Sequence, residues 1–185
     1  MSGIRIIAGQ FKGKLLTLPP QDLTRPSSDR LRQAVFNILA NHLSFNGIKV
    51  LDAFAGSGAY GLEALSRGAH HATFCENQNT VQKILQKNIT DTLKNSNSKS
   101  RVNYDLFQLQ SGKLFDLIFI DPPYDKGLEN EALDYLYKNN LLAKNAIAII
   151  EQRKGALEFN HTKFTRLPQR IYGKCQITLN LFNNC

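Results

Sequence analysis

The residues best suited to chemistry stand in a row, Asp121-Pro122-Pro123-Tyr124, directly after a short apolar run. The nitrogen of an amino group on an aromatic base is a poor nucleophile, because its lone pair is delocalised into the ring. Two acceptors that grip its hydrogens, the Asp121 carboxylate and the Pro122 carbonyl, would draw that nitrogen toward tetrahedral geometry and stabilise the developing charge. The prolines stiffen the carbonyl, and Tyr124 offers a ring on which a base can stack. The tetrapeptide favours chemistry at such an amino group; the alternative is a structural, proline-rich strand exit.

A glycine-rich stretch, Leu51 to Gly61, lies between another apolar run and a predicted helix. Its residues Gly56 and Gly58, with Gly61, satisfy G-x-G-x-x-G, a fingerprint of nucleotide-binding turns. Such a turn bends tightly and lets a ligand approach the backbone at the carboxyl edge of an open α/β sheet. Glu76 stands 18 residues after Gly58, at the end of the next predicted strand, where it can accept hydrogen bonds from a ribose diol. This arrangement fits NAD and S-adenosylmethionine alike.

The elements that must position these residues alternate between short apolar runs and amphipathic stretches. This alternation predicts a doubly wound α/β fold, and the unbroken apolar run 117–120 is typical of a parallel strand covered on both faces. Asp105 ends the third predicted strand, where it meets either the adenine of a bound nucleotide or only the start of a loop. The strands are predicted at 48–54, 72–76, 102–105, 114–120, 146–151, 163–167 and 175–182, the last two as a closing antiparallel hairpin, and the helices at 59–67, 78–93 and 128–137.

An N-terminal extension, residues 1–47, precedes this body. Alternating apolar and polar residues at 4–6 and 14–18 predict a short hairpin. Serines suited to N-capping then precede apolar residues and His42 at helical spacing, which predicts a helix of about 15 residues. A chain of 185 residues is expected to form one domain, with the catalytic body at 48–185.

The net charge of +8 is unevenly distributed along the chain. Residues 1–47 carry six Lys or Arg and two Asp or Glu, residues 48–150 carry eleven of each, and residues 151–185 carry six and two, so the surplus is +4, 0 and +4. Two basic flanks around a neutral body suggest a surface for a polyanion, because clustered cations displace phosphate counterions. The alternative is a basic protein with no such role.

Composition argues against several other classes. Hydrophobic residues make up 42% and charged residues 21%, as in ordinary globular proteins, and no apolar run approaches the ~20 residues of a membrane span. The first ten residues lack the pattern of a signal peptide, so a cytoplasmic location is expected. The three cysteines are widely spaced and odd in number and form no C-x-x-C pair, so free thiols and no metal site are expected.

In this order, the motifs resemble a known family. Asp52-x-Phe54-Ala55-Gly56-Ser57-Gly58, Glu76 and the Asp121 tetrapeptide are similar to the class I methyltransferases that act on amino groups. The flanks narrow the resemblance to the RsmD family of bacterial 16S rRNA guanine-N2 methyltransferases. The motifs that carry it are Arg5-Ile6-Ile7-Ala8-Gly9, Lys12-Gly13-Lys14-x-Leu16, Arg25-Pro26-Ser27-x-Asp29-Arg30-x-Arg32, Phe36-Asn37-Ile38-Leu39, the run Gly61 to Ala69, and Arg170-x-Tyr172-Gly173. Two residues depart from the family pattern: Ser27 replaces the usual Thr, and Gln33 replaces a Glu, which removes a charge near the expected site.

The resemblance implies a mostly parallel, seven-stranded Rossmann-like sheet and S-adenosylmethionine as cofactor, with its ribose on Glu76 and its adenine near Asp105. A guanine of 16S rRNA, free or in the small ribosomal subunit particle, would rotate out of its stack and enter beside Asp121. Its 2-amino nitrogen would then attack the sulfonium methyl. A monomer is expected. The other implied residues are Asp52, Phe54, Gly56, Ser57 and Gly58 for the cofactor, and Lys12, Arg25, Arg30 and Arg170 for RNA.

Three alternatives use the same residues differently. An NAD(P)-dependent oxidoreductase would use the glycine turn and Glu76, but it leaves Asp121 to Tyr124 unexplained. A DNA amino-methyltransferase is chemically equivalent, but no segment is large enough for a target-recognition domain. A non-enzymatic RNA-binding protein would bind RNA without regard to cofactor.

Overall fold

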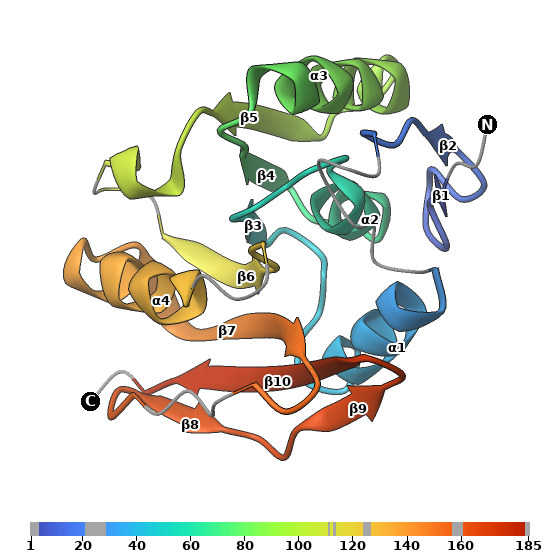
Figure 1. Cartoon of the computed structure of the whole chain (residues 1–185). Coiled ribbons are helices and arrows are strands. Elements are labelled where there is room, and N and C mark those ends of the chain that lie inside the picture. Colours follow the sequence, from blue (N-terminus) through green and yellow to red (C-terminus); the bar gives the residue numbers. More distant parts are fainter. Residues whose placement is uncertain are drawn as a thin grey trace.

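Five parallel strands form the centre of the sheet in this computed structural model, which describes residues 4–20, 29–110, 112, 114–123, 127–156 and 161–183 (Figure 1). The whole sheet contains β3 (Lys49–Asp52), β4 (His71–Cys75), β5 (Lys99–Asn103), β6 (Phe115–Ile120), β7 (Leu142–Arg153), β8 (Phe164–Arg166), β9 (Arg170–Tyr172) and β10 (Cys175–Phe182), of which β3 to β7 are the five parallel strands. They lie in the order β5-β4-β3-β6-β7-β10-β8, and β9 pairs with β10 to complete an eight-stranded sheet. β10 is antiparallel to its three neighbours β7, β8 and β9.

Helices cover both faces of this sheet, as Figure 1 shows. One face packs against α1 (Asp29–Leu39), α2 (Ala59–Ser66) and α3 (Asn79–Leu93), and the other against α4 (Leu128–Lys138) and the short 3-10 helix η1 (Leu106–Gln108). Successive strand residues serve opposite faces: Val50 packs into the first apolar cluster and Leu51 into the second. The predicted doubly wound α/β fold is confirmed.

Several predicted boundaries are wrong; β7, for example, spans Leu142–Arg153 and not 146–151. β5 spans Lys99–Asn103 and so begins before and ends before the strand predicted at 102–105. Its first three residues are polar and exposed at the sheet edge, so no apolar signal marked its start. The helix predicted to extend through His42 ends at Leu39, and His42 lies exposed in the turn that follows.

The closing hairpin is also more elaborate than predicted. The strand predicted at 175–182 is confirmed as β10. The strand predicted at 163–167 is present as the shorter β8. Between them lies β9, which the sequence reading missed because two of its three residues are exposed and no apolar alternation marks it. Both short strands pair with β10.

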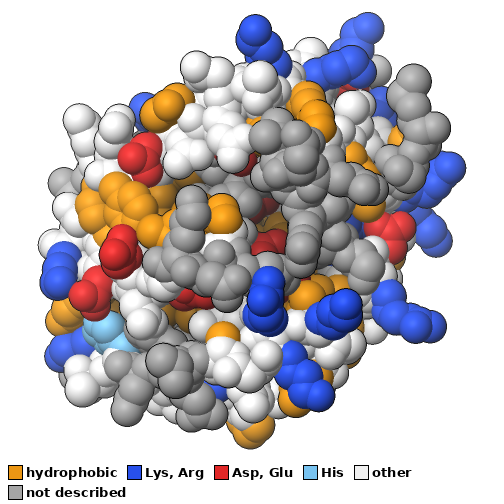
Figure 2. Space-filling view, viewed as in Figure 1, with side chains coloured by type: hydrophobic (Ala, Val, Ile, Leu, Met, Phe, Trp, Pro, Cys, Tyr) orange, Lys and Arg blue, Asp and Glu red, His pale blue; other side chains and the backbone are white. Residues whose placement is uncertain are grey.

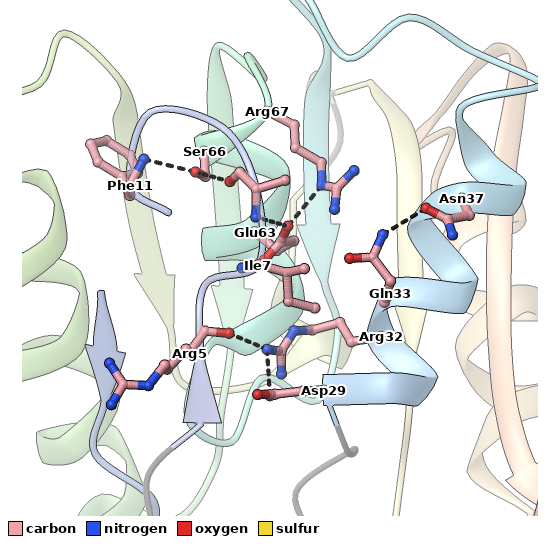
Figure 3. Close-up of polar contacts among 11 residues, drawn as sticks. Arg5, Ile7, Phe11, Asp29, Arg32, Gln33, Asn37, Glu63, Ser66 and Arg67 are labelled. Atoms are coloured by element: carbon pink, nitrogen blue, oxygen red, sulfur yellow. Dashed lines mark hydrogen bonds and ion pairs between the residues drawn. The ribbon is translucent and has the colours of Figure 1, made fainter. Parts of the chain in front are cut away.

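The N-terminal hairpin, β1 (Ile4–Arg5) and β2 (Leu15–Leu16), is confirmed and lies against α2. Glu63 of α2 is completely buried, and its carboxylate accepts hydrogen bonds from the backbone N–H groups of Ile7 (2.7 Å) and Ala8 (3.1 Å). One turn later the Ser66 hydroxyl accepts from the Phe11 N–H at 2.9 Å. Figure 3 shows these contacts side by side. A buried carboxylate is stable only when its oxygens are paired, so these bonds fix the hairpin to the body.

Buried Arg32 joins α1 to the same hairpin. Its guanidinium donates to the Asp29 carboxylate at 2.9 Å and to the backbone carbonyl of Arg5 (Figure 3). The extension, residues 4–20 with α1, is therefore attached to the body through specific polar contacts as well as through its apolar side chains.

Gly9 generates the first prediction, because it combines a left-handed backbone (φ +82°) with close contact to α2. An added Cβ would lie 1.8 Å from the Ser66 carbonyl oxygen, whereas at Gly13 (φ +86°) it would meet nothing within 4 Å. Gly13→Ala should lower the free energy of unfolding by about 1 kcal/mol, the cost of the backbone alone. Gly9→Ala should cost at least about 2 kcal/mol more, since the hairpin must move off α2. Denaturant unfolding of both variants measures the difference, and equal costs would show that the hairpin is not held as described.

Candidate active site

The carboxyl ends of β3 and β6 bring the glycine turn and the Asp121 tetrapeptide together. The strands are parallel neighbours with Asp52 opposite Phe119, and the Ala53 N–H donates to the Phe119 carbonyl at 2.9 Å. Asp121 therefore lies two residues beyond this pair on one strand, as Phe54 does on the other. The chain crosses to opposite faces after these two strands, to α2 and to α4. Open α/β sheets bind ligands at such a switch point.

The tetrapeptide itself is partly described. Asp121 is half-buried, Pro122 is buried and Pro123 is exposed, so an acidic side chain and a rigid carbonyl stand at the rim of the edge. Tyr124 lies outside the described residues. The catalytic roles assigned to these four residues stay predictions.

Gly58 occupies the turn before α2 with φ +80°, a left-handed conformation that favours glycine. An added Cβ would lie 2.6 Å from Cδ1 of Leu85 on α3 and 3.4 Å from the Phe74 ring. From the sequence, the lack of a Cβ in this turn was expected to let a ligand approach the backbone. At Gly58 the missing Cβ instead makes room for core side chains, so the cofactor role of this residue stays a prediction that rests on its backbone.

Asp52 is buried at the end of β3, and its carboxylate accepts the Gly61 N–H at 2.9 Å. Burial raises the pKa of Asp52 from 3.8 to about 7, against the lowering effect of this hydrogen bond, and the nearby charge of Glu76 adds to the rise. The proposed cofactor turn thus contains a carboxyl group that changes charge near neutral pH.

Glu76 follows β4 and connects two loops at the same edge. One carboxylate oxygen accepts the Gly56 N–H at 3.1 Å and the other accepts the Gln78 N–H at 2.9 Å. The group is half-buried, and each carboxylate oxygen can accept more than one hydrogen bond, so acceptor capacity remains for a ribose diol. Its carboxylate also steadies the glycine turn, a structural role that the sequence did not indicate.

Cys75, the last residue of β4, marks where the predicted cofactor carboxylates gather. Its thiol is buried, and burial together with the charges of Asp52, Asp105 and Glu76 raises its pKa to about 12. Asp105 also accepts the Phe107 N–H at 3.0 Å and so caps η1. This supports the loop-start interpretation of Asp105, and its contact with adenine stays a prediction.

The cations predicted to bind RNA are not all at this edge. Arg170 is exposed on β9, across β10 from Glu151 at the carboxyl end of β7. Arg30 is exposed in the first turn of α1. Lys12 lies in the hairpin turn that packs on the C-terminal end of α2, at the opposite edge of the sheet. Arg25 lies outside the described residues. These four assignments stay predictions.

Two buried polar contacts at the site were missed from sequence. The Tyr60 hydroxyl, at the start of α2, donates to the carboxylate of Glu151 at 3.0 Å, and the Tyr60 ring stacks on Phe119 with centroids 4.7 Å apart. Asn88 of α3 donates to the Ser57 carbonyl of the glycine turn at 2.9 Å. A signal for Asn88 was present in the sequence: it is a polar residue on the apolar stripe of the helix, three residues after Leu85.

Neither a metal-binding group nor a membrane-spanning helix is found in the part of the chain that the structure describes. No three His, Cys, Asp or Glu side chains are grouped to hold a metal ion there. Within the same residues, no helix has both the length and the apolarity needed to cross a membrane.

The strand order and the switch-point site define a class I methyltransferase. The particular family follows from comparison with known proteins: the chain belongs to the family described as conserved hypothetical protein 95, whose model matches residues 4–181. The chain is 42% identical over 149 residues to ribosomal RNA small subunit methyltransferase D of Escherichia coli K12, covering 80% of this chain and 74% of that protein. It is 37% identical over 175 residues to the protein of the same name from Haemophilus influenzae, covering 92% and 89%.

A solved structure agrees with this placement. A putative methyltransferase from Escherichia coli superposes with a TM-score of 0.83 at 35% identity and covers 98% of this chain and 99% of its own. The resemblance to the RsmD family and the class I methyltransferase fold are therefore confirmed.

The raised pKa of Asp52 predicts how stability depends on pH. Its folded pKa of about 7 exceeds the unfolded value of 3.8, so between these values the folded state binds the extra proton and the free energy of unfolding falls as pH rises. The fall is at most about 1.4 kcal/mol per pH unit and ends above pH 7. Asp52→Asn should remove this component in denaturant unfolding measured from pH 4 to 8.

The control is a carboxyl group whose pKa is shifted in the opposite direction. Lys87, bonded to exposed Asp91, lowers the pKa of that carboxyl, so Asp91→Asn should leave the stability profile between pH 5 and 7 unchanged. An Asp52→Asn profile that runs parallel to wild type over that range would contradict the assignment of a buried, protonating carboxyl.

Proposed function

We propose that this chain transfers a methyl group from S-adenosylmethionine to the exocyclic 2-amino group of a guanine in the RNA of the small ribosomal subunit. The observation that supports this proposal most directly is the register of β3 and β6, which brings Asp121 and the Pro122 carbonyl beside the glycine turn. The names of the relatives support the reaction class and the RNA substrate. A ribosomal RNA substrate also fits the cytoplasmic location expected from the sequence.

The residues present suit this cofactor. Glu76 retains acceptor capacity for a ribose diol, and the carboxylates around Cys75 give the proposed cofactor site a negative potential that favours a cationic sulfonium. When bound, the cofactor supplies an electrophilic methyl group. The chain's own contribution is to hold the amino nitrogen with Asp121 and Pro122 and to align it, since proximity and orientation are worth up to about 7–11 kcal/mol in favourable cases.

The oxidoreductase and the non-enzymatic RNA-binding protein find no support in the relatives, which are named as methyltransferases. The glycine turn and Glu76 fit either nucleotide cofactor, so this discrimination rests on the relatives and on the Asp121 tetrapeptide.

A cluster of cations at the carboxyl edge is the surface best placed to hold RNA near Asp121. Exposed Arg153, Lys154, Arg170 and Lys174 lie where β7, β9 and β10 meet, and the Lys154 N–H donates to the Lys174 carbonyl at 2.8 Å. Figure 2 shows Lys and Arg side chains gathered over these elements, below a central hollow that contains acidic side chains. β7 is the parallel neighbour of β6, so these cations flank the proposed base site.

Asp121 supplies the sharpest test of the reaction. Asp121→Ala should retain cofactor affinity and lose methyl transfer by roughly 100-fold or more, because a preorganised group is removed from the transition state. Asp121→Asn keeps one acceptor oxygen and cannot take a proton, so clear residual activity would favour an acceptor over an obligatory base. The assay is labelled-methyl transfer to unmodified small-subunit RNA and particles, followed by mapping of the labelled base.

Asp116 provides a matched control at the other end of the same strand. Its carboxylate accepts the Lys49 N–H at 2.8 Å, and Asp116→Asn should transfer methyl groups at close to the wild-type rate. Wild-type turnover in both Asp121 variants would remove Asp121 from the mechanism.

RNA affinity should depend steeply on salt, and the C-terminal cations should carry much of that dependence. Replacing Lys154, Arg170 and Lys174 together with Gln should lower the slope of log affinity against log salt by about 2, since each phosphate contact contributes roughly 0.7–0.9. The control replaces Lys83 and Lys87 of α3 and Lys94 at its C-terminal end, which are all exposed; α3 lies beside β4 and β5, at the other end of the strand order from β10 (Figure 1). Cofactor affinity should stay unchanged in both triple variants. A larger slope change in the α3 triple would mean that RNA docks elsewhere.

A further inference from the structure

Asn88 of α3 joins two segments that are far apart in the sequence. Its side chain is 3% exposed and both ends of its amide are bonded: Oδ1 accepts the Thr17 N–H, and Nδ2 donates to the carbonyls of Thr17 and Ser57, each at 2.9 Å. Thr17 directly follows β2 of the N-terminal hairpin, and Ser57 belongs to the glycine turn. One buried amide thus connects the extension to the proposed cofactor site.

The contact with Ser57 fixes a peptide unit within that turn. The Ser57 carbonyl and the Gly58 N–H belong to the same peptide, and this N–H donates to the Ala55 carbonyl at 2.7 Å. With Asn88 on its other side, the peptide is held at both ends. A rotation of this peptide would reorient the turn backbone, so the bond from Asn88 sets the surface that the cofactor meets.

The contact with Thr17 requires an amide. Its oxygen faces an N–H group, and its NH₂ faces two carbonyls. An aspartate would turn a carboxylate oxygen toward the two carbonyls. An alanine would remove the bonds to the Thr17 N–H and to both carbonyls, and the loss is most costly at the buried bond to Ser57.

Residues 4–20 have further anchors on α1, where Arg32 donates to the Arg5 carbonyl, and on α2. Glu63 holds Ile7 and Ala8, and Ser66 holds Phe11, so residues 4–20 are fastened to α2 through these contacts and to α3 through Asn88. These contacts form a continuous path from Glu63 through the hairpin to Thr17, and from Thr17 through Asn88 to Ser57.

We infer that Asn88 is a positioning residue that makes cofactor affinity depend on the docking of residues 4–20, although these residues place no side chain in the proposed cofactor site. The inference rests on the proposed function, because it requires that the glycine turn hold the cofactor.

A double-mutant cycle on the full-length chain tests the coupling. Calorimetry with S-adenosylhomocysteine, the demethylated cofactor, should show affinity roughly tenfold weaker in Asn88→Ala, as expected for loss of a buried hydrogen-bond network. Glu63→Gln should weaken affinity a few-fold in the wild-type background and have no further effect in the Asn88→Ala background, since the path from the extension is already broken. Asn88→Asp provides a second variant of similar volume with the same expected loss.

Kinetics separate positioning from general damage. Asn88→Ala should raise the KM for the cofactor by about the same factor as its affinity falls, with kcat largely retained. Thr92→Val is the control, since Thr92 is buried one turn further along α3 and its hydroxyl has no hydrogen-bond partner among the described residues. It should leave both constants unchanged.

The outcomes distinguish the inference from the proposed function. If wild type fails to bind S-adenosylmethionine and its product, the proposed function fails and the inference with it. If wild type binds and transfers methyl groups while the effects of Asn88→Ala and Glu63→Gln simply multiply, only the coupling is overturned. Unchanged cofactor affinity in both Asn88 variants would overturn it as well.

Discussion

The hydrogen bond from the Gly61 N–H to the carboxylate of Asp52 is the contact on which the site depends. The first turn of a helix leaves N–H groups without partners, and Gly58, at the N-cap of α2, has no side chain to accept one. A residue of the preceding strand supplies the acceptor instead. Because the acceptor belongs to β3 and the donor to α2, the bond fixes the angle at which the helix leaves the strand, and the glycine turn between them has little choice of path.

Much of the remaining structure is then attached to α2. Tyr60 in its first turn reaches Glu151 on β7, two strands from β3, and stacks on Phe119 of the strand between. Glu63 and Ser66 hold the hairpin on its other side. An eight-residue helix, about 12 Å long, thus makes polar contacts to three separate parts of the chain. Three of these acceptors are buried carboxylates, those of Asp52, Glu63 and Glu151.

The sequence predicted those parts of the fold and site that follow from local patterns. Continuous apolar runs revealed the central strands, because both of their faces are covered, and the glycine spacing revealed the turn after β3. β5 and β9 failed this test since they lie at edges and expose polar residues, so no periodicity marks them. The bonds of Asn88, Glu63 and Tyr60 join residues 31 to 91 positions apart, and such pairings are created by topology, which a single sequence does not display. The need for glycine at position 58 was misjudged for the same reason, because the side chain that excludes a Cβ there is Leu85, which comes from a different helix.

The protonation of Cys75 has a consequence for the durability of the enzyme. A sulfonium methyl group reacts with any good nucleophile, and a thiolate is a better one than the amino group of a base. Cys75 lies among the carboxylates of the proposed cofactor site, but burial, reinforced by the charges of these carboxylates, raises its pKa to about 12 and so keeps it in the unreactive thiol form. The burial of this side chain thereby also guards the protein against alkylating itself.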